Sequence, residues 1–427
     1  MARLFRIGIA WLVLMLVLAA GGTAARAAGP ASSPASKRPP LLAFYYTWYG
    51  TPFGPARRWA HWGKPAGGLL APKGTDPNRI GSKPGLRDIA SAAYPLIGPY
   101  DSRQREVVRW HVRLAKAAGI DGFLVDWWGP GGWQKPPGQT YKAFVDVLLP
   151  IAEEENFKVC LCDELPQFFN GFDKVVTWTA EYLDRFRRSP AYLHIDGQPV
   201  YYIYQVWQGK MSVAQCRRLI RTVERRSGPV FWIVDKMRCR LTRAPNSPSG
   251  RELFFPDDWL AVREIDALGG YATFSNLRVH EARDLGVLFA RLVRQARAAG
   301  KKVLLPIHPG HNNSKFNNKP YVIPRRAGRT LEGFLRAASD AGADFLAVTS
   351  FNEWPETTVV EPAWTWPDPY RYLGILARFT GKTFRPPPLP PVKALDPAIV
   401  PLLRRRGQGG PERRGPGQGS QTRSATR

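Results

Sequence analysis

Eight short apolar segments alternate with amphipathic helical patterns between residues 41 and 353. The segments expected to be strands are 41–49, 122–128, 157–164, 199–206, 229–236, a weak one at 269–275, 302–308 and 344–353. The stretches between them repeat apolar residues at i, i+3 and i+4, and several close at a glycine. This alternation predicts an α/β fold, a (β/α)8 TIM barrel built as a single domain. A doubly wound open sheet is the competing fold, but no glycine-rich phosphate-binding sequence follows any of the strands.

Shifts in composition bound this domain at both ends. Residues 1–27 carry two early arginines, the apolar run IGIAWLVLMLVLAA and the A-x-A sequence at 25–27, which together are typical of a secretory signal peptide. An uncleaved membrane anchor is the alternative, although the run is short for a span. Residues 28–40 form a Pro/Ser linker, 41–383 the expected barrel, and 384–427 a proline-rich and then basic tail expected to be disordered. We therefore expect a secreted or cell-envelope protein, bound to the membrane only if the leader is not cleaved.

The net charge of +27 first suggests a nucleic-acid partner. No nucleic-acid-binding motif accompanies the charge, and much of it lies on helix faces such as CRRLIRTVERR, where solvated arginines are usual. The tail from Pro401 adds seven arginines against Glu412. We expect no specific nucleic-acid partner, and the basic tail instead fits an anionic cell-envelope polymer.

Thiol and metal chemistry find little support in the sequence. Cys160, Cys162, Cys216 and Cys239 allow three pairings into two disulfides, and buried free thiols fit equally well. His61, His308 and His311 could be metal ligands, but the loop HPGHNNSK offers no carboxylate beside them. We therefore expect no metal and no cofactor.

Polar and aromatic side chains collect where the predicted strands end. In a (β/α)8 barrel these ends share one rim, where the reacting groups sit. The residues expected to bind substrate there are Tyr46, Tyr49, His61, Trp127, Trp128, Tyr204, His308 and Asn352. Because Tyr46 and Tyr49 differ in strand parity, as do Trp127 and Trp128, one member of each pair is expected to face the cleft.

Carboxylates accompany these aromatic residues at the rim. Glu353 closes the last predicted strand and Glu356 begins its loop, while Asp126, Asp163 and Glu164 end earlier strands. Cleavage of a glycosidic bond needs one carboxyl group as proton donor and a second as nucleophile or base. The structural alternative makes Glu356 a helix-entry acid and Glu353 the partner of an arginine. We expect Glu353 and Glu356 to be catalytic, with retention and inversion both open from the residues alone.

Several stretches, taken in order, resemble one family. They are FYYTWYGTP with WAHW, PLIGPYDSRQREVVRWHVRLAKAAGIDGFLVDWWGPG, PGHNNSK and SFNEWPETTVVEP, and they extend across most of residues 41–362. They are similar to the endo-α-mannosidase and endo-α-1,2-mannanase family, glycoside hydrolase family 99. The last stretch resembles that family's Asn-Glu-Trp-x-Glu-Gly-Thr-x-x-Glu-Pro signature and is the most specific of the set.

The resemblance implies an activity and roles for both glutamates. It implies a (β/α)8 barrel that cleaves α-mannosidic bonds within an oligo- or polysaccharide, with retention and without a metal. In the implied route the 2-hydroxyl of the sugar attacks its own anomeric carbon and forms a 1,2-anhydro intermediate. The glutamate matching Glu353 would assist that hydroxyl, and the glutamate matching Glu356 would protonate the leaving oxygen and later activate water.

The chain departs from the family pattern close to these glutamates. The family usually has histidine before its second glutamate and glycine after it, where this chain has Pro355 and Thr357. The usual tyrosine of the PGY segment is His311, followed by Asn312 and Asn313. These changes leave the sugar and linkage open. They also keep two alternatives: a non-catalytic glycan-binding barrel of the cell envelope, and an envelope-associated structural protein that holds anionic polymers through its tail.

Overall fold

The computed structural model describes residues 38–63, 74–82, 84–131, 138–164, 171–204, 211–242, 250–272, 282–315, 317 and 319–408. The chain divides into the units Met1–Arg38 and Pro39–Arg427, and the described residues belong almost wholly to the second. The expected signal peptide and all but the end of the Pro/Ser linker lie outside them. Among the described residues, none of the helices has both the length and the apolar character needed to cross a bilayer.

Eight parallel strands close into a barrel, as predicted. They are β1 (Leu41–Tyr45), β2 (Gly122–Trp127), β3 (Lys158–Asp163), β5 (Gln198–Ile203), β6 (Phe231–Asp235), β9 (Ala267–Gly269), β10 (Lys302–Ile307) and β13 (Phe345–Val348). Each pairs with the next, and β13 returns to pair with β1. Their residues are almost all buried, because one face fills the barrel and the other meets the helices.

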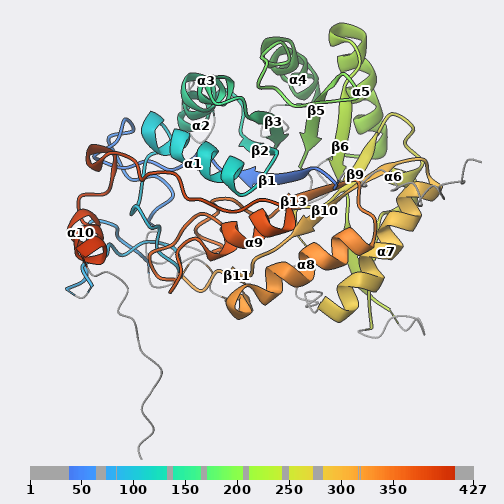
Figure 1. Cartoon of the computed structure of the whole chain (residues 1–427). Coiled ribbons are helices and arrows are strands. Elements are labelled where there is room, and N and C mark those ends of the chain that lie inside the picture. The colour runs from blue at the N-terminus through green and yellow to red at the C-terminus, as the bar shows by residue number, and fades with distance from the viewer. Residues whose placement is uncertain are drawn as a thin grey trace, which may run out of the picture. The chain divides into compact units, whose positions relative to one another are not determined.

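Helices surround the strands, with α4 and α5 on one side and α7 and α8 on another in Figure 1. Their bounds are α1 (Arg105–Ala117), α2 (Gln139–Lys142), α3 (Leu149–Glu154), α4 (Phe172–Phe186), α5 (Val213–Ser227), α6 (Asp257–Leu260), α7 (Ala282–Ala298), α8 (Arg329–Asp340), α9 (Arg371–Phe379) and α10 (Val400–Gln408). In α5 the buried residues Cys216, Leu219, Ile220 and Val223 repeat at helical spacing. The helix begins with a capping box between Ser212 and Gln215 and ends at Gly228, whose φ is +80°.

Two expected elements differ in detail. The helical stretch between the second and third predicted strands contains a π-helical segment (Ala143–Leu148) between α2 and α3, next to Pro150, which cannot donate a backbone hydrogen bond. The weak strand expected at 269–275 lies earlier, as β9. Short antiparallel pairings that we did not predict join β7 (Arg238–Leu241) to β8 (Arg251–Phe254), and β11 (His311–Asn312) to β12 (Val322–Ile323). A further two-residue strand, β4 (His194–Ile195), pairs with β5.

Three aspartates secure the end of the barrel opposite the predicted rim. Asp121, Asp266 and Asp344 precede β2, β9 and β13, and they accept the backbone N–H groups of Leu41, Trp232 and Val303 at 2.8 to 2.9 Å. Each bond ties a strand to the start of another strand. These carboxylates therefore support the fold, and the chemically loaded ends of the strands are at the opposite rim.

The expected domain boundary at residue 383 is wrong. Residues 384–408 continue the folded domain, with a 3-10 turn at Val392–Ala394 followed by α10. Asp396 is fully buried, pairs with Arg87 at 2.9 Å and accepts a hydrogen bond from the Tyr94 hydroxyl at 3.2 Å. Proline-rich composition suggested disorder, but a few buried side chains hold this segment in place. The rest of the predicted tail, 409–427, lies outside the described residues.

Candidate active site

The loop that follows β13 carries both predicted catalytic glutamates. The chain leaves the strand through a cis peptide bond between Thr349 and Ser350. The Ser350 hydroxyl accepts the backbone N–H of Glu353 at 2.7 Å, and the backbone N–H of Thr357 bonds to the carbonyl of Trp354 at 2.9 Å. These bonds fold residues 350–357 into a compact turn at the mouth of the barrel. Glu353 is 5% exposed and Glu356 is partly buried.

A chain of hydroxyl groups ends on Glu356. The Tyr46 hydroxyl donates to the Tyr271 hydroxyl at 2.8 Å, and Tyr271 donates to Glu356 Oε2 at 3.3 Å. Burial raises the pKa of Glu356 to about 7, and the hydrogen bond from Tyr271 opposes part of that rise. A carboxyl group with this pKa holds its proton near neutral pH and can still release it, which suits a general acid.

The pKa of Tyr271 indicates that Glu353 lies nearby. Burial raises the pKa of Tyr271 most strongly, and the nearby charges of Glu356 and then Glu353 raise it further. Burial likewise dominates at Tyr46, where the charge of Glu353 again contributes. The two glutamates therefore both lie near Tyr271: Glu356 accepts its hydrogen bond, and Glu353 is close enough to act through its charge.

A second pair of carboxyl groups lies beside Glu353. Burial raises the pKa of Asp126, followed by the charge of Glu164, with which Asp126 shares a hydrogen bond, and the charge of Glu353 adds to the rise. The indole of Trp128 donates to Asp126 Oδ2 at 2.9 Å and opposes the rise. Two hydrogen-bonded carboxyl groups hold one proton between them. This part of the rim therefore offers both a donor and an acceptor next to Glu353.

Tyr204 lies between the two carboxyl groupings. Burial raises its pKa first, and the charges of Glu164, Asp235 and Glu356 raise it further. Its ring meets Tyr271 edge-on at a centroid distance of 5.6 Å. Tyr204 is thus one of the predicted binding residues that the structure brings to the carboxylates.

A short aromatic stack extends from the carboxylates. The ring of Tyr46 lies 4.5 Å from Trp48, and Trp48 stacks on His61 at 4.2 Å with an interplanar angle of 3°. Trp48 and His61 are partly exposed. Flat, partly exposed rings beside acids suit the apolar faces of a sugar. Tyr46 and His61 were predicted to bind substrate, whereas Trp48 was not singled out.

Four predicted binding residues lie elsewhere. Trp127 is fully buried among Tyr141, Phe144, Tyr182 and Phe186 of the helical layer, because it has the opposite strand parity to Asp126 and Trp128. His308 is fully buried against Phe334 of α8. We therefore correct both assignments: these side chains support the packing of the barrel.

Tyr49 and Asn352 are also fully buried, and their polar atoms hold the main chain. The Tyr49 hydroxyl donates to the carbonyl of Asn352 at 2.8 Å and accepts the N–H of Trp354 at 3.0 Å. The Asn352 amide bonds to both the N–H and the carbonyl of Tyr46, at 2.8 and 3.0 Å. They hold the glutamate loop against the loop after β1, and their expected role as sugar ligands is corrected.

Like Trp48, Tyr271 and Asp235 are members of the site that we did not predict. Asp235 ends β6, and it accepts the backbone N–H of Tyr271 at 2.9 Å and the Tyr202 hydroxyl at 3.3 Å. Burial raises the pKa of Asp235 to about 7. Its position as an acid at a strand end could have identified it. Tyr271 follows the weakest strand, so no comparable signal marked it.

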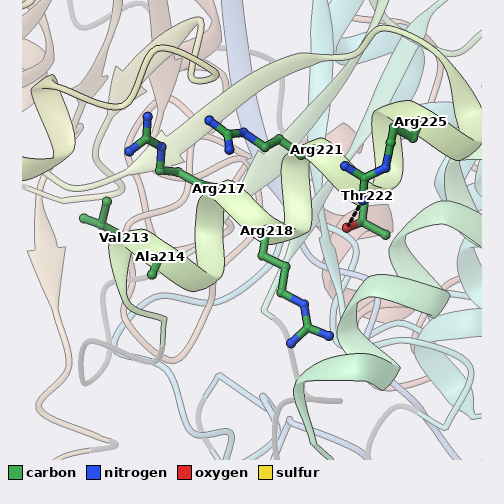
Figure 2. Close-up of a pocket in the computed structure, with 7 residues that line it drawn as sticks. All are labelled: Val213, Ala214, Arg217, Arg218, Arg221, Thr222 and Arg225. Carbon is green, nitrogen blue, oxygen red and sulfur yellow. Dashed lines mark hydrogen bonds between the residues drawn. The ribbon is translucent and has the colours of Figure 1, made fainter.

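A hollow of about 600 Å³ lies apart from these residues, on the outer helix α5 (Figure 2). Four arginines line it: Arg217, Arg218, Arg221 and Arg225. Arg217 and Arg221 bind Glu264, and Arg218 binds Asp173. The hollow contains no carboxylate or aromatic side chain of the rim.

Comparison with known proteins finds one related family. The family described as Glycosyl hydrolase family 99 matches residues 39–227. The human "Glycoprotein endo-alpha-1,2-mannosidase-like protein" is 27% identical over 354 residues, covering 76% of this chain and 68% of that protein. Its zebrafish (Danio rerio) counterpart of the same name is 25% identical over 342 residues, covering 75% of this chain and 70% of that protein.

The barrel itself has a similar solved structure. The GH99 endo-alpha-mannosidase from Bacteroides thetaiotaomicron superposes with a TM-score of 0.60 at 22% identity, covering 80% of this chain and 96% of that one. At this identity the likeness bears on the fold alone. The chain is similar to glycoside hydrolase family 99, and its relatives support activity as a glycoside hydrolase.

Proposed function

We propose that this protein is a glycoside hydrolase that cleaves α-mannosidic bonds within a glycan chain. The observation that carries the proposal is the pairing around Tyr271: a glutamate with a pKa near 7 in contact with it, and a second glutamate whose charge reaches it. The names of the relatives, endo-alpha-1,2-mannosidase-like proteins, support an α-mannoside as the substrate class. Pro355, Thr357 and His311 differ from the usual family pattern, so the experiment below tests several glycans as substrates.

The proposed reaction retains the anomeric configuration in two steps. Glu353 takes the proton of the sugar 2-hydroxyl as that oxygen attacks the anomeric carbon, while Glu356 donates its proton to the departing glycosidic oxygen. The product of this step is a 1,2-anhydro sugar with Glu356 ionised. Glu356 then removes a proton from water as the water opens the ring, and O2 recovers its proton from Glu353. Two inversions give net retention, as in other two-step glycosidases.

The geometry supports this division of labour. Glu356 has the raised pKa that a donor to the leaving oxygen needs, and burial supplies it. Glu353 is held by its own backbone bond to Ser350, next to the buried Asp126. The hydroxyls of Tyr46 and Tyr271 form a hydrogen-bonded chain that ends on Glu356.

The experiment offers α-1,2-, α-1,3- and α-1,6-linked mannans and other α-glycans to the purified protein. Product size reports endo action, and proton NMR of the first-formed anomer reports retention. Glu353→Gln and Glu356→Gln should each abolish release of reducing sugar while the protein remains folded. Binding of a glycan with no product in any assay would instead favour the non-catalytic glycan-binding barrel.

We also propose that the protein acts outside the cytoplasm. The proposal rests on the sequence of residues 1–27, and the buried thiols of Cys160, Cys162 and Cys216 are compatible with either side of a membrane. Fractionation of cells that produce the whole chain, with N-terminal sequencing of the recovered protein, tests both export and cleavage. Recovery of intact chain in the cytoplasm would contradict the proposal.

The excess of positive charge supports one accessory proposal, retention on an anionic polymer of the cell envelope. The arginine-lined hollow on α5 (Figure 2) and the basic residues after 408 are the candidate contacts. Two variants test these contacts separately. A chain ending at residue 408 lacks the basic residues, and a variant with Arg218 and Arg225 changed to glutamine removes two arginines of the hollow. Salt-sensitive retention on isolated envelopes should fall in at least one of them, and unchanged retention in both would end the proposal.

A further inference from the structure

A fully buried carboxylate, Glu361, lies beneath the glutamate loop and takes no part in the proposed reaction. Its Oε2 accepts the Tyr100 hydroxyl at 2.8 Å and the indole N–H of Trp354 at 2.9 Å. Its Oε1 lies 3.2 Å from Nε2 of His111, which is also fully buried. A buried carboxylate held by three neighbours has a defined position, because loss of any one bond leaves a polar group unsatisfied.

The bonds around His111 select one arrangement of its proton. Glu361 as a carboxylate can only accept, so Nε2 of His111 must carry the hydrogen. The other ring nitrogen, Nδ1, lies 3.0 Å from the Tyr45 hydroxyl, and in the neutral imidazole it accepts a hydrogen bond from that hydroxyl. The chain of donors therefore runs from Tyr45 through His111 to Glu361, and each buried polar atom of the three side chains is satisfied.

Trp354 connects this network to the catalytic glutamates. It is the residue after Glu353 and lies two positions before Glu356, and it is fully buried. Its side chain is held by Glu361, and its backbone N–H is held by Tyr49. The indole thus fixes the centre of the turn from which both glutamates project.

Tyr100 connects the network to the opposite side of the site. Its hydroxyl donates to Glu361 and accepts a bond from the Asn352 amide at 3.2 Å. The same amide holds the main chain of Tyr46, whose hydroxyl leads to Tyr271 and Glu356. Glu361 therefore secures both the glutamate loop and the tyrosines around it.

We propose that Glu361 is a positioning residue for this reaction, acting through Trp354 and Tyr100 to hold Glu353 and Glu356 at the sugar. The expected effects on kcat and KM depend on the proposed function, whereas the structural role of Glu361 does not. Displacement of reacting groups by about 1 Å costs on the order of 100-fold in rate, so loss of this anchor should lower kcat far more than it changes KM.

Two substitutions separate positioning from general stability. In Glu361→Gln the amide oxygen can still accept from Tyr100 and Trp354, and the amide nitrogen then faces His111. His111 can adapt by moving its proton from Nε2 to Nδ1 and donating to Tyr45. Glu361→Leu has a similar volume but no acceptor. Asp344→Ala is the matched control, because Asp344 accepts the backbone N–H of Val303 at the barrel end opposite the site.

We expect Glu361→Gln to keep kcat within about fivefold and Glu361→Leu to lose about 100-fold or more, with KM changed less than about threefold. Asp344→Ala should lower Tm without a change in kcat per folded molecule. Nitrogen NMR of labelled histidine should show the proton of His111 on Nε2 in the wild type and on Nδ1 in Glu361→Gln. Folded Glu361→Leu with wild-type kcat would overturn the proposal.

A readout without turnover keeps the test separate from the proposed function. Carboxyl NMR should find the pKa of Glu356 near 7 in the wild type and in Glu361→Gln, and displaced in Glu361→Leu. An unchanged pKa in Glu361→Leu would count against positioning even if the wild type hydrolyses none of the mannans. If Glu361→Leu does not fold, Trp354→Phe keeps an aromatic ring but removes the indole donor and some buried volume, and we expect about a tenfold loss of kcat from it. Wild-type kcat in Trp354→Phe would likewise overturn the proposal.

Discussion

The hydroxyl of Tyr271 donates to Glu356 at 3.3 Å and is itself the acceptor of the Tyr46 hydroxyl. A donor on a carboxylate stabilises its ionised form and lowers its pKa. Burial acts in the opposite direction and is the larger effect, so the pKa of Glu356 comes to about 7. The acid strength of this group is therefore set by two opposing features that mutation can separate.

Tyr271→Phe should move the alkaline limb of kcat/KM to higher pH. The limb reports ionisation of the general acid, and loss of the hydrogen bond raises the pKa of Glu356 further above 7. The measurement is a pH profile of hydrolysis from pH 4 to 10. Tyr192→Phe is the control, because the Tyr192 hydroxyl bonds to the Val200 carbonyl within the barrel wall. A limb that moves to lower pH in Tyr271→Phe would contradict the assignment.

Glu356→Gln should stabilise the folded protein at alkaline pH. The folded-state pKa, about 7, lies above the ordinary value of 4.5, so the folded state binds the proton more tightly than the unfolded state. The stability associated with that proton is present below pH 4.5 and is lost as pH rises through 7. Neutral glutamine avoids this loss, and we expect a gain of about 1–3 kcal/mol in the free energy of unfolding at pH 8.

Urea unfolding at pH 4.5 and pH 8 checks this expectation. The gain should be absent at the lower pH, where Glu356 is protonated in the folded state. Glu332→Gln, at a half-exposed ion pair with Arg378, serves as the control and should show little difference between the two pH values. An equal gain at both pH values would show that the effect is not due to ionisation.

Much of the fold could be predicted from the sequence because strand and helix periodicities are local properties. The eight strands and the closed barrel followed from that alternation. The direction of the Trp127 side chain depends on which face of β2 meets the helices. Strand parity predicted that either Trp127 or Trp128 faces the cleft, but it did not identify which one does. The expectation of disorder after residue 383 was wrong for residues 384–408, because that segment is held by partners distant in the sequence, such as Arg87 and Tyr94.

The candidate site was predictable only in part, for a similar reason. Glu353 and Glu356 stood out as acids after a recognisable strand. Tyr271 reaches Glu356 only through the closure of the barrel, and Glu361 gains its partners from three separate segments. Contacts of this kind are set by the tertiary structure, and no spacing within a short window reveals them.

Asp396→Ala should destabilise the protein by about 3 kcal/mol or more, because it leaves the largely buried Arg87 without its counter-ion. The carboxylate also accepts from Tyr94 and from the backbone of Ala398. Urea unfolding measures the change, with Glu332→Ala as the surface ion-pair control, expected within about 0.5 kcal/mol. A loss as small as that of the control would mean that residues 384–408 are not needed for the folded domain.

The backbone of Thr357, next to Glu356, has a φ of +52°, in the left-handed region that glycine adopts without strain. The related family usually has glycine here. The Thr357 hydroxyl offsets the strain, because it accepts the N–H of Ala92 at 3.2 Å and donates to the carbonyl of Trp354 at 3.2 Å. Thr357→Val keeps the strain and the volume but loses both bonds, so we expect a destabilisation of about 1–3 kcal/mol.

Thr357→Gly differs from Thr357→Val because it also removes the backbone strain. It relieves about 1 kcal/mol of backbone strain and gives up the same two bonds, so its free energy of unfolding should lie within about 1 kcal/mol of wild type and above that of Thr357→Val. Urea unfolding of the three proteins side by side measures the order. If Thr357→Val matched the wild type, the hydroxyl would have no part in holding the loop, and the chain would tolerate threonine beside its acid for some other reason.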